Sequence, residues 1–305
     1  MADQTNHVAR PRPPRSPTTL LALLALAAAI PAQAQTTLRW KFTQGEKHHY
    51  ILTQVHDVFA KAAGDLDLHS TTTFTVDTTW AIREVSADGS ARMTQTINRI
   101  QVSSKDKDEE LKFDSRRPNA IDKEFAPVKK NCQVMIGKPI ELTMSPLGFV
   151  KDVKIPPEAK RRPADTPYAS NLTITTFRDF VDQAAPSFPV RAVGVGDAWD
   201  GLVHEHTSDG QTTIALMYTF RGPADDLQRI DADLKTRIDE SELNLSITSE
   251  KSSASYFFDN ELGLLRRSEV LQELTFVSHA EIRVVESLKT ITKTTLKLID
   301  DAAKE

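Results

Sequence analysis

The sequence of 305 residues contains a single cysteine, Cys132, and only 11 glycines. With one cysteine, no disulfide can form within the chain. We interpret Cys132 as a small, buried apolar residue, and a disulfide between two chains is the alternative. The shortage of glycine argues against glycine-rich phosphate loops. The one Gly-x-Gly segment, Gly194-Val195-Gly196, precedes β-branched and polar residues instead of a helix, so it predicts a turn that leads into a strand.

Motifs that carry catalysis are also missing. No Gly-x-Ser-x-Gly nucleophile elbow occurs. Lys129 and Lys130 lie near Cys132, but no histidine partner can be assigned to that thiol. We therefore assign no catalytic or cofactor-binding residue, expect no cofactor, and predict a non-enzymatic protein.

Neither sign of charge dominates: acidic residues exceed basic ones slightly, and the net charge of the whole chain is −4. This mild acidity argues against nucleic acid or an anionic membrane surface as an electrostatic partner. Removal of residues 1–34 would take away three arginines and one aspartate, which leaves a net charge of −6.

The first 34 residues have the pattern of a secretory signal peptide. Arg10, Arg12 and Arg15 precede an apolar run of 11 residues, Leu20 to Ile30, and a small-x-small site ends at Ala34. A membrane-spanning helix needs about 20 apolar residues, so the run is too short to be an anchor. Because no cysteine follows it, an acylated N-terminus is excluded as well. We predict cleavage after Ala34, a mature chain without a transmembrane span, and a periplasmic or extracellular location.

Residues 35–305 are expected to form one β-rich domain, because apolar and polar residues alternate with a period of two. Within Ser70 to Ile82 the even positions from Phe74 onward are apolar or threonine. From Val270 to Leu298 the even face is mostly apolar and the odd face mostly charged. The second run would span about 95 Å as one strand, so it must fold back, and we place the turn at Ser278–Glu281. A change of apolar parity between Ile97 and Ile100 predicts a β-bulge.

Turn residues mark two hairpins. Ser145-Pro146-Leu147-Gly148 suits a type I turn, and Asp259 to Gly263 offers a glycine for positive φ. We predict two helices, Asn119 to Asn131 and Tyr168 to Ala185. Residues 155–167 are rich in proline and are predicted to form a loop or linker, which carries Lys160-Arg161-Arg162. The predicted fold is mainly β: one large domain of long, curved antiparallel strands in an open barrel or cup, with about two helices packed on one face.

His204-Glu205-His206 is the one local pattern that suggests a metal. On a strand, residues i and i+2 point to the same face, so both imidazoles would project together. A site needs a third donor and usually a fourth, and no spacing selects one. The remaining candidates are His48, His49, His56 and His69. An exposed polar strand end explains His204 and His206 equally well, so we assign no metal and keep both only as candidates.

Five short segments, taken in their order, resemble a family of exported bacterial proteins of unknown function. They are Leu38 to Lys47, Thr79-Trp80, Met93 to Ile97, Gly196 to Trp199 and Phe257 to Gly263. The resemblance covers nearly the whole mature chain and implies no catalytic residue, because the family has no assigned activity. Some members are similar to lipoproteins, from which this chain departs by lacking the acylated cysteine. The expected shape is also similar to periplasmic lipoprotein carriers, which have a curved antiparallel sheet with helices on its concave side.

These observations lead to three functional hypotheses. The first is an exported, non-enzymatic protein that binds an apolar or lipid-like small molecule in the β-cup, since two helices would leave much of a long apolar face uncovered. The second is a structural or interaction module whose partner is a protein of the cell envelope. The third is a metal-dependent hydrolase that uses His204 and His206.

Overall fold

The computed structural model describes residues 35–62, 66–106, 109–117, 126–157, 181, 184–207, 210–241, 245–279 and 285–299. The chain divides into two compact units, residues 1–34 and 35–305, and every described residue belongs to the second. The predicted signal peptide and its cleavage site therefore lie outside the described residues and stay a prediction. Among the described residues, no helix has the length and apolarity that a membrane crossing requires.

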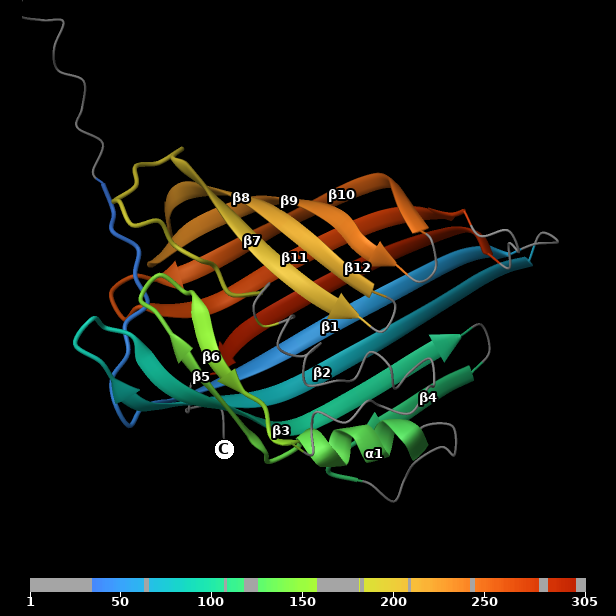
Figure 1. The fold of residues 1–305 in the computed structure, drawn as a ribbon, viewed down its shortest axis with the longest axis horizontal. Coiled ribbons are helices and arrows are strands. Elements are labelled where there is room, and N and C mark those ends of the chain that lie inside the picture. Colours follow the sequence, from blue (N-terminus) through green and yellow to red (C-terminus); the bar gives the residue numbers. More distant parts are fainter. Residues whose placement is uncertain are drawn as a thin grey trace, which may run out of the picture. The chain divides into compact units, whose positions relative to one another are not determined.

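Long antiparallel strands join into one sheet of 12 strands (Figure 1). Neighbouring strands follow the order β6-β5-β3-β2-β1-β12-β11-β10-β9-β8-β7, and β4 pairs with β3 beside this path. The path ends at β6 and β7, so the sheet is open, as predicted. The strands are β1 (Lys47–Ala62), β2 (Leu66–Val85), β3 (Ala91–Asp106), β4 (Glu109–Asp114), β5 (Pro139–Met144), β6 (Val150–Lys154), β7 (Ala198–Thr207), β8 (Gly210–Ala224), β9 (Leu227–Ser241), β10 (Leu245–Asp259), β11 (Leu264–Ser278) and β12 (Val285–Ile299).

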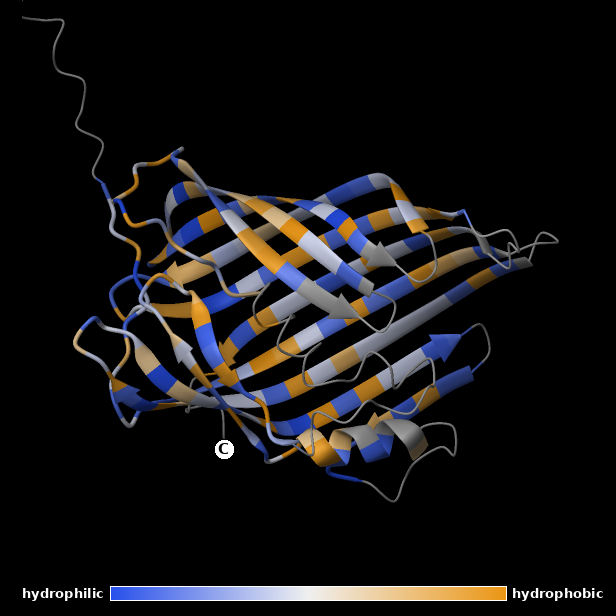
Figure 2. Ribbon diagram, in the orientation of Figure 1, coloured by the Kyte–Doolittle hydropathy of each residue, from blue (hydrophilic) through white to orange (hydrophobic). Residues whose placement is uncertain are grey.

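Hydrophobic and hydrophilic residues alternate along the strands (Figure 2). Because successive side chains of a strand point to opposite sides, the sheet has two different faces. On β1 and β2, the even positions Leu52, Val76 and Trp80 are buried in the hydrophobic core. Odd positions such as Thr53 and Thr75 point to the opposite side of the same strands. We call the face that carries the core the inner face, and the other the outer face.

The predicted reversals of the chain are confirmed. Strand β11 ends at Ser278 and β12 begins at Val285, so the long C-terminal run folds back within that interval. In the turn between β5 and β6, the Gly148 amide donates to the Ser145 carbonyl over 2.9 Å. Between β10 and β11, the Gly263 amide donates to the Asp259 carbonyl over 2.7 Å.

The predicted β-bulge is also present. Asp77 of β2 pairs with Arg99 of β3, and the next residue, Thr78, pairs with Ile97. Asn98 is therefore the extra residue, and it lies between the two isoleucines whose parity differs. The bulge lets Ile97 and Ile100 both reach the core although they are three residues apart.

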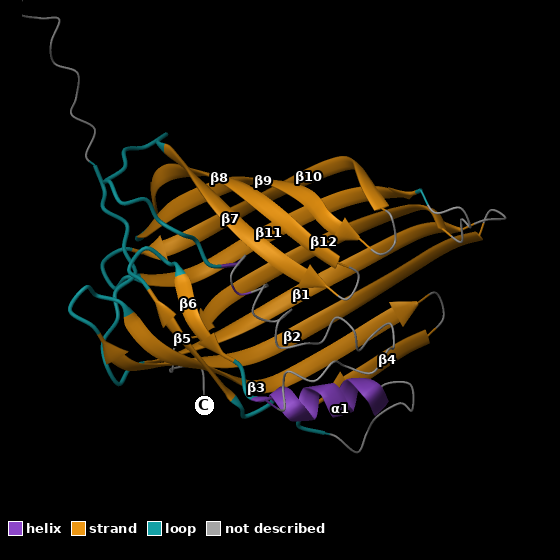
Figure 3. Ribbon diagram, viewed as in Figure 1, coloured by secondary structure: helices purple, strands orange, loops and turns teal. Residues whose placement is uncertain are grey.

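Segments from distant parts of the chain pack on the inner face at one end of the strands. Trp40 lies at the centre of an aromatic cluster, with ring centroids 6.4 Å from Trp80, 6.3 Å from Phe188 and 5.3 Å from Phe258. The described loops gather at one end of the strands (Figure 3). Since Trp40, Trp80 and Phe258 belong to the segments on which the family resemblance depends, those segments specify the packing of this end of the fold.

One predicted helix is observed in part. Helix α1 (Ala126–Met135) covers the described part of the predicted segment and continues four residues beyond Asn131, while residues 119–125 lie outside the described residues. Its Cys132 and Met135 are buried in the same core as Phe113 of β4, so α1 covers apolar residues of the sheet as predicted. Most of the second predicted helix, and the basic triplet Lys160 to Arg162, lie outside the described residues.

Candidate functional site

A row of polar side chains crosses the inner face of six neighbouring strands. The strand register aligns its members, one to a strand: Ser104, Thr72, His56, Thr292, Gln272 and Ser252. Two pairs are hydrogen-bonded, Thr72 Oγ1 with Ser104 Oγ over 3.2 Å and His56 Nδ1 with Thr292 Oγ1 over 2.7 Å. We call these six residues the polar row.

The polar row divides the inner face into two halves with different packing. Each inner-facing position along the strands forms a row parallel to the polar row. The second row toward the aromatic cluster consists of six residues that are at most 6% exposed: Ile100, Val76, Leu52, Leu296, Ser268 and Tyr256. The second row in the other direction consists of Leu68, Ala60, Leu288, Phe276 and Ile247. Leu68 is 45% exposed and the other four are half-buried. We call the first side the packed half and the second the open half.

The packed half leaves little of its apolar surface for a ligand. Its apolar surface is covered by the protein's own side chains, including Trp40, Ala184 and Phe188. The Ser268 hydroxyl donates to the Ala184 carbonyl over 2.6 Å, which fixes that segment on β11. The open half has a row of partly exposed apolar side chains at a distance where the packed half is buried, so it is the part of the inner face better suited to an apolar ligand.

Next to the polar row, strands β9 and β10 separate. Their pairing runs from Phe258 and Gln228 to Ser253 and Asp233 and ends there, although both strands continue. Beyond that point the Thr236 amide donates to the carboxylate Oε1 of Glu250 over 2.7 Å. The Glu250 side chain therefore replaces a missing hydrogen bond of the ladder at this fork.

Buried polar atoms gather at the fork. The side chain of Glu250 is only 2% exposed. Its Oε2, the Thr236 hydroxyl and the Ser252 hydroxyl are buried without a hydrogen-bond partner among the described residues. The Nζ of Lys235 lies 3.0 Å from Oε2, outside hydrogen-bonding geometry, on a side chain that is 78% exposed. Buried polar groups are normally satisfied, so three unsatisfied ones together suggest a place for a ligand.

His56 shapes the electrostatics of the polar row. Burial lowers the pKa of its imidazole below the ordinary 6.5, and the carboxylate of Asp57 raises it by a smaller amount. His56 is therefore neutral at pH 7 and does not oppose a cation on the inner face. Among inner-facing positions 48–60 of β1, 288–298 of β12, 268–278 of β11 and 245–258 of β10, Glu250 is the one acidic residue, and none is lysine or arginine.

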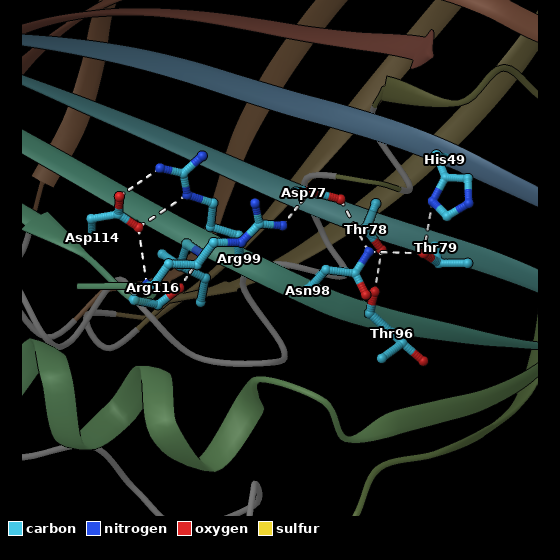
Figure 4. A network of polar contacts seen from close by, with 11 residues as sticks. His49, Asp77, Thr78, Thr79, Thr96, Asn98, Arg99, Asp114 and Arg116 are labelled. Atoms are coloured by element: carbon cyan, nitrogen blue, oxygen red, sulfur yellow. Dashed lines mark hydrogen bonds and ion pairs between the residues drawn. The ribbon is translucent and has the colours of Figure 1, made fainter. Parts of the chain in front are cut away.

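The outer face carries a larger polar network around the bulge (Figure 4). The Asn98 amide donates to Asp77 Oδ1 over 3.0 Å and to Thr79 Oγ1 over 2.8 Å, and Thr79 is within 3.0 Å of His49 Nδ1. Arg116 lies 3.5 Å from the Asp77 carboxylate. The network joins three strands at the bulge.

A second ion pair continues this network. Arg99 binds both carboxylate oxygens of Asp114, which lowers the pKa of that acid to about 2. Two shallow grooves, of about 430 and 320 Å³, lie beside these groups. Because Asp77 and Asp114 each have an arginine partner, we interpret the network as structural.

The candidate metal ligands lie at the edge of the sheet. His204 lies on the outer side of the edge strand β7, where it pairs with Thr213, and His206 pairs with Gln211 two residues further along the strand. The exposed His204 has its Nδ1 3.0 Å from Thr213 Oγ1, and that hydroxyl also donates to Asp239. The side chain of His206 lies outside the described residues. In the part of the chain that the structure describes, no group of three or more potential ligands comes together.

The other singled-out residues occupy structural positions. Cys132 is completely buried, and burial raises the pKa of its thiol to about 12, which fits the interpretation as an apolar core residue and not a disulfide between chains. His48 and His49 face opposite sides of β1, as their adjacency predicts. The turn at Gly194 to Gly196 leads into β7, as predicted.

Glu250 was missed in the sequence although a signal was present. It shares its parity with Ser252, Ala254, Tyr256 and Phe258, all on the inner face of β10. A carboxylate on the apolar face of a strand is expensive to bury and needs a partner. That mismatch marks the position, but the separation of β9 from β10 that accounts for it is a property of the folded sheet.

No family model matches the chain, and no curated protein shows significant sequence similarity to it. Several solved structures match. A lipovitellin structure described by its lipid–protein interactions has 12% identity and a TM-score of 0.45; the match covers 85% of this chain and 26% of that one, so this chain spans about a quarter of its length. An outer membrane lipoprotein-sorting protein domain from Vibrio parahaemolyticus has 8% identity and a TM-score of 0.15, with 83% and 88% covered. A DUF1329 family protein from Desulfovibrio piger has 10% identity and a TM-score of 0.19, with 84% and 89% covered.

The TM-scores of these three matches are below 0.5, so the matches carry no argument about what this chain binds. The argument for a function therefore rests on the inner face itself.

Proposed function

We propose that this protein is a non-enzymatic binding protein for an apolar or lipid-like ligand, held on the open half of the inner face. The observation that supports this most directly is the contrast between the two halves. Rows at equal distance from the polar row are buried on one side and partly exposed on the other. Removal of apolar surface from water stabilises a complex by about 25 cal/mol for each Å² buried, so these exposed side chains favour an apolar occupant.

The polar row gives such a ligand an orientation. An alkyl chain that lies over Phe276, Leu288 and Ala60 would meet the row at one end, where hydroxyl and amide groups can bind a polar head. A ligand with both parts matches the inner face better than a pure hydrocarbon. We therefore favour an amphiphile, and with residues 1–34 as an export signal its place would be outside the cytoplasm.

A matched pair of substitutions on β11 tests the proposal. Leu274 faces the open half, whereas Leu271, which is 37% exposed, faces the outer side of the same strand. The full chain is titrated with the neutral fluorescent dye N-phenyl-1-naphthylamine. We expect Leu274→Asp to weaken binding at least tenfold, because a carboxylate would have to be desolvated by the ligand, and Leu271→Asp to change it less than twofold.

Extraction of the purified protein with organic solvent, followed by mass spectrometry, provides the second measurement. A co-purified amphiphile that is lost in Leu274→Asp supports the proposal. Equal dye affinities of Leu271→Asp and Leu274→Asp, together with an extract that contains no lipid, would contradict it and favour the alternative of an envelope interaction module.

A further inference from the structure

We propose that the fork between β9 and β10 is a site for a protonated amine, and that the preferred ligand is a cationic amphiphile. This inference rests on the proposed function, since the apolar part of the ligand is assigned to the open half. The site consists of the Glu250 carboxylate with the hydroxyls of Thr236 and Ser252. All three are hydrogen-bond acceptors, and a primary ammonium group offers three donors.

The strands place these acceptors at neighbouring positions of the fork. Glu250 and Ser252 are two residues apart on β10 and point to the same face. Thr236 lies across the fork, where its amide binds Glu250 Oε1 over 2.7 Å. That bond holds the carboxylate in place, so Oε2 remains as the acceptor for a ligand. Ser252 belongs to the polar row, which places the site at the border between the packed and open halves.

Charge selects an amine over other head groups. Glu250 is the one acidic residue of the inner-facing positions defined above, and its side chain is almost completely buried. A cation that binds there is attracted by a carboxylate in surroundings of low polarity, where hydrogen bonds between charged groups are strongest. An anionic head group would be repelled by it.

Lys235 is the competitor for this site. Its ammonium group lies 3.0 Å from Glu250 Oε2, but its side chain is 78% exposed and can turn to solvent. The lysine contact lies outside hydrogen-bonding geometry, so a ligand cation that donates hydrogen bonds to the same carboxylate can displace it. The lysine also shows that the carboxylate accommodates an ammonium group at contact distance.

The apolar wall begins one row from the carboxylate. Glu250 pairs with Leu274, and Phe276 pairs with Ile247 and Leu288. An alkyl chain attached to the bound amine would therefore follow these side chains along the open half. The apolar tail would supply most of the binding affinity, and the amine would determine the preference for a cationic head group.

Three probes with the same C12 tail test the site: dodecylamine, dodecanol and dodecanoate. Each displaces N-phenyl-1-naphthylamine from the full-length protein at pH 7. We expect dodecylamine to bind at least tenfold more tightly than dodecanoate, because the interaction is a hydrogen bond between charged groups. Ethanolamine, which lacks the tail, is expected not to displace the dye at the same concentrations.

Glu250→Gln is expected to remove the preference for the amine while it leaves dodecanol binding unchanged, since glutamine keeps an oxygen acceptor for the Thr236 amide. Lys235→Met removes the competing cation and should increase dodecylamine affinity severalfold. The matched control is Glu273→Gln, which changes an outer-face carboxylate of β11 that is also paired with a lysine. It should alter none of the three affinities.

Equal binding of all three probes, unchanged by Glu250→Gln or Lys235→Met, would overturn the amine site and leave the apolar binding function intact. Failure of every C12 probe to bind would instead refute the proposed function, and the amine site with it. If Glu250→Gln does not fold, the result for Lys235→Met decides, because the side chain of Lys235 is 78% exposed.

Discussion

Gly148, in the turn between β5 and β6, provides a test of how the packed half is assembled. Its φ is +86°, a left-handed conformation that favours glycine. A Cβ at this position would lie 2.6 Å from the Pro186 carbonyl oxygen and 3.0 Å from Trp40 Nε1. Those two atoms form a hydrogen bond with each other over 3.2 Å. Gly148→Ala would therefore strain the backbone and disturb the contact between the turn, the N-terminal segment and the segment at Pro186.

The expected loss has two parts. The left-handed conformation costs an alanine about 1 kcal/mol, and overpacking against fixed backbone costs about 2 kcal/mol more. We expect a total loss of about 3 kcal/mol in the free energy of unfolding and a Tm lower by roughly 6–12 °C. Gly45→Ala is the matched control, since Gly45 has a φ of +89° but nothing within 4 Å of the added Cβ.

Urea unfolding, followed by tryptophan fluorescence, measures both variants. The control should lose only about 1 kcal/mol, the conformational part. Equal losses for Gly148→Ala and Gly45→Ala would refute the close packing of the β5–β6 turn against Trp40 and Pro186.

Two further predictions concern titratable groups. Arg99 lowers the pKa of Asp114 to about 2 from an ordinary 3.8, so this ion pair stabilises the fold fully above pH 4 and its contribution is lost as the pH falls through 2. Asp114→Asn should lower the free energy of unfolding by about 1–2 kcal/mol at pH 7. In urea titrations, the difference in unfolding free energy between this variant and the unchanged protein should shrink toward pH 2. A difference that does not change with pH would contradict the pairing. Burial raises the pKa of Cys132 to about 12, so the thiol should resist iodoacetamide at pH 8 in the folded protein and react in urea. Rapid labelling of the folded protein would show that the core around α1 is open.

Local patterns in the sequence predicted the strands and their faces. Alternation from Val270 to Leu298 assigned the inner positions of β11 and β12 correctly, because one face of those strands is packed. The parity change at Ile97 and Ile100 located the bulge at Asn98, since an extra residue must shift the pattern.

The division of the inner face could not be predicted in the same way. It depends on where Trp40, Phe188 and α1 pack, which is decided by contacts between residues far apart in the chain. The polar row was in the sequence, for example as Gln272 and Thr292 on apolar faces, but only the strand register shows that these residues are neighbours. Glu250 was recognised as a candidate ligand-binding residue only from the structure, because the fork beside it is a feature of the folded sheet.

Contact quenching by a brominated ligand tests most directly whether an apolar ligand lies on the open half. The chain with Phe276→Trp carries an added tryptophan on the open half. Of the three tryptophans already present, Trp40 and Trp80 lie in the packed half and Trp199 stacks on Tyr218 of β8. We predict that 12-bromododecanol quenches the fluorescence added by Phe276→Trp and leaves that of the unchanged chain nearly constant. Equal quenching of both proteins, or quenching of neither at concentrations that displace the dye, would contradict the placement of the ligand on the open half.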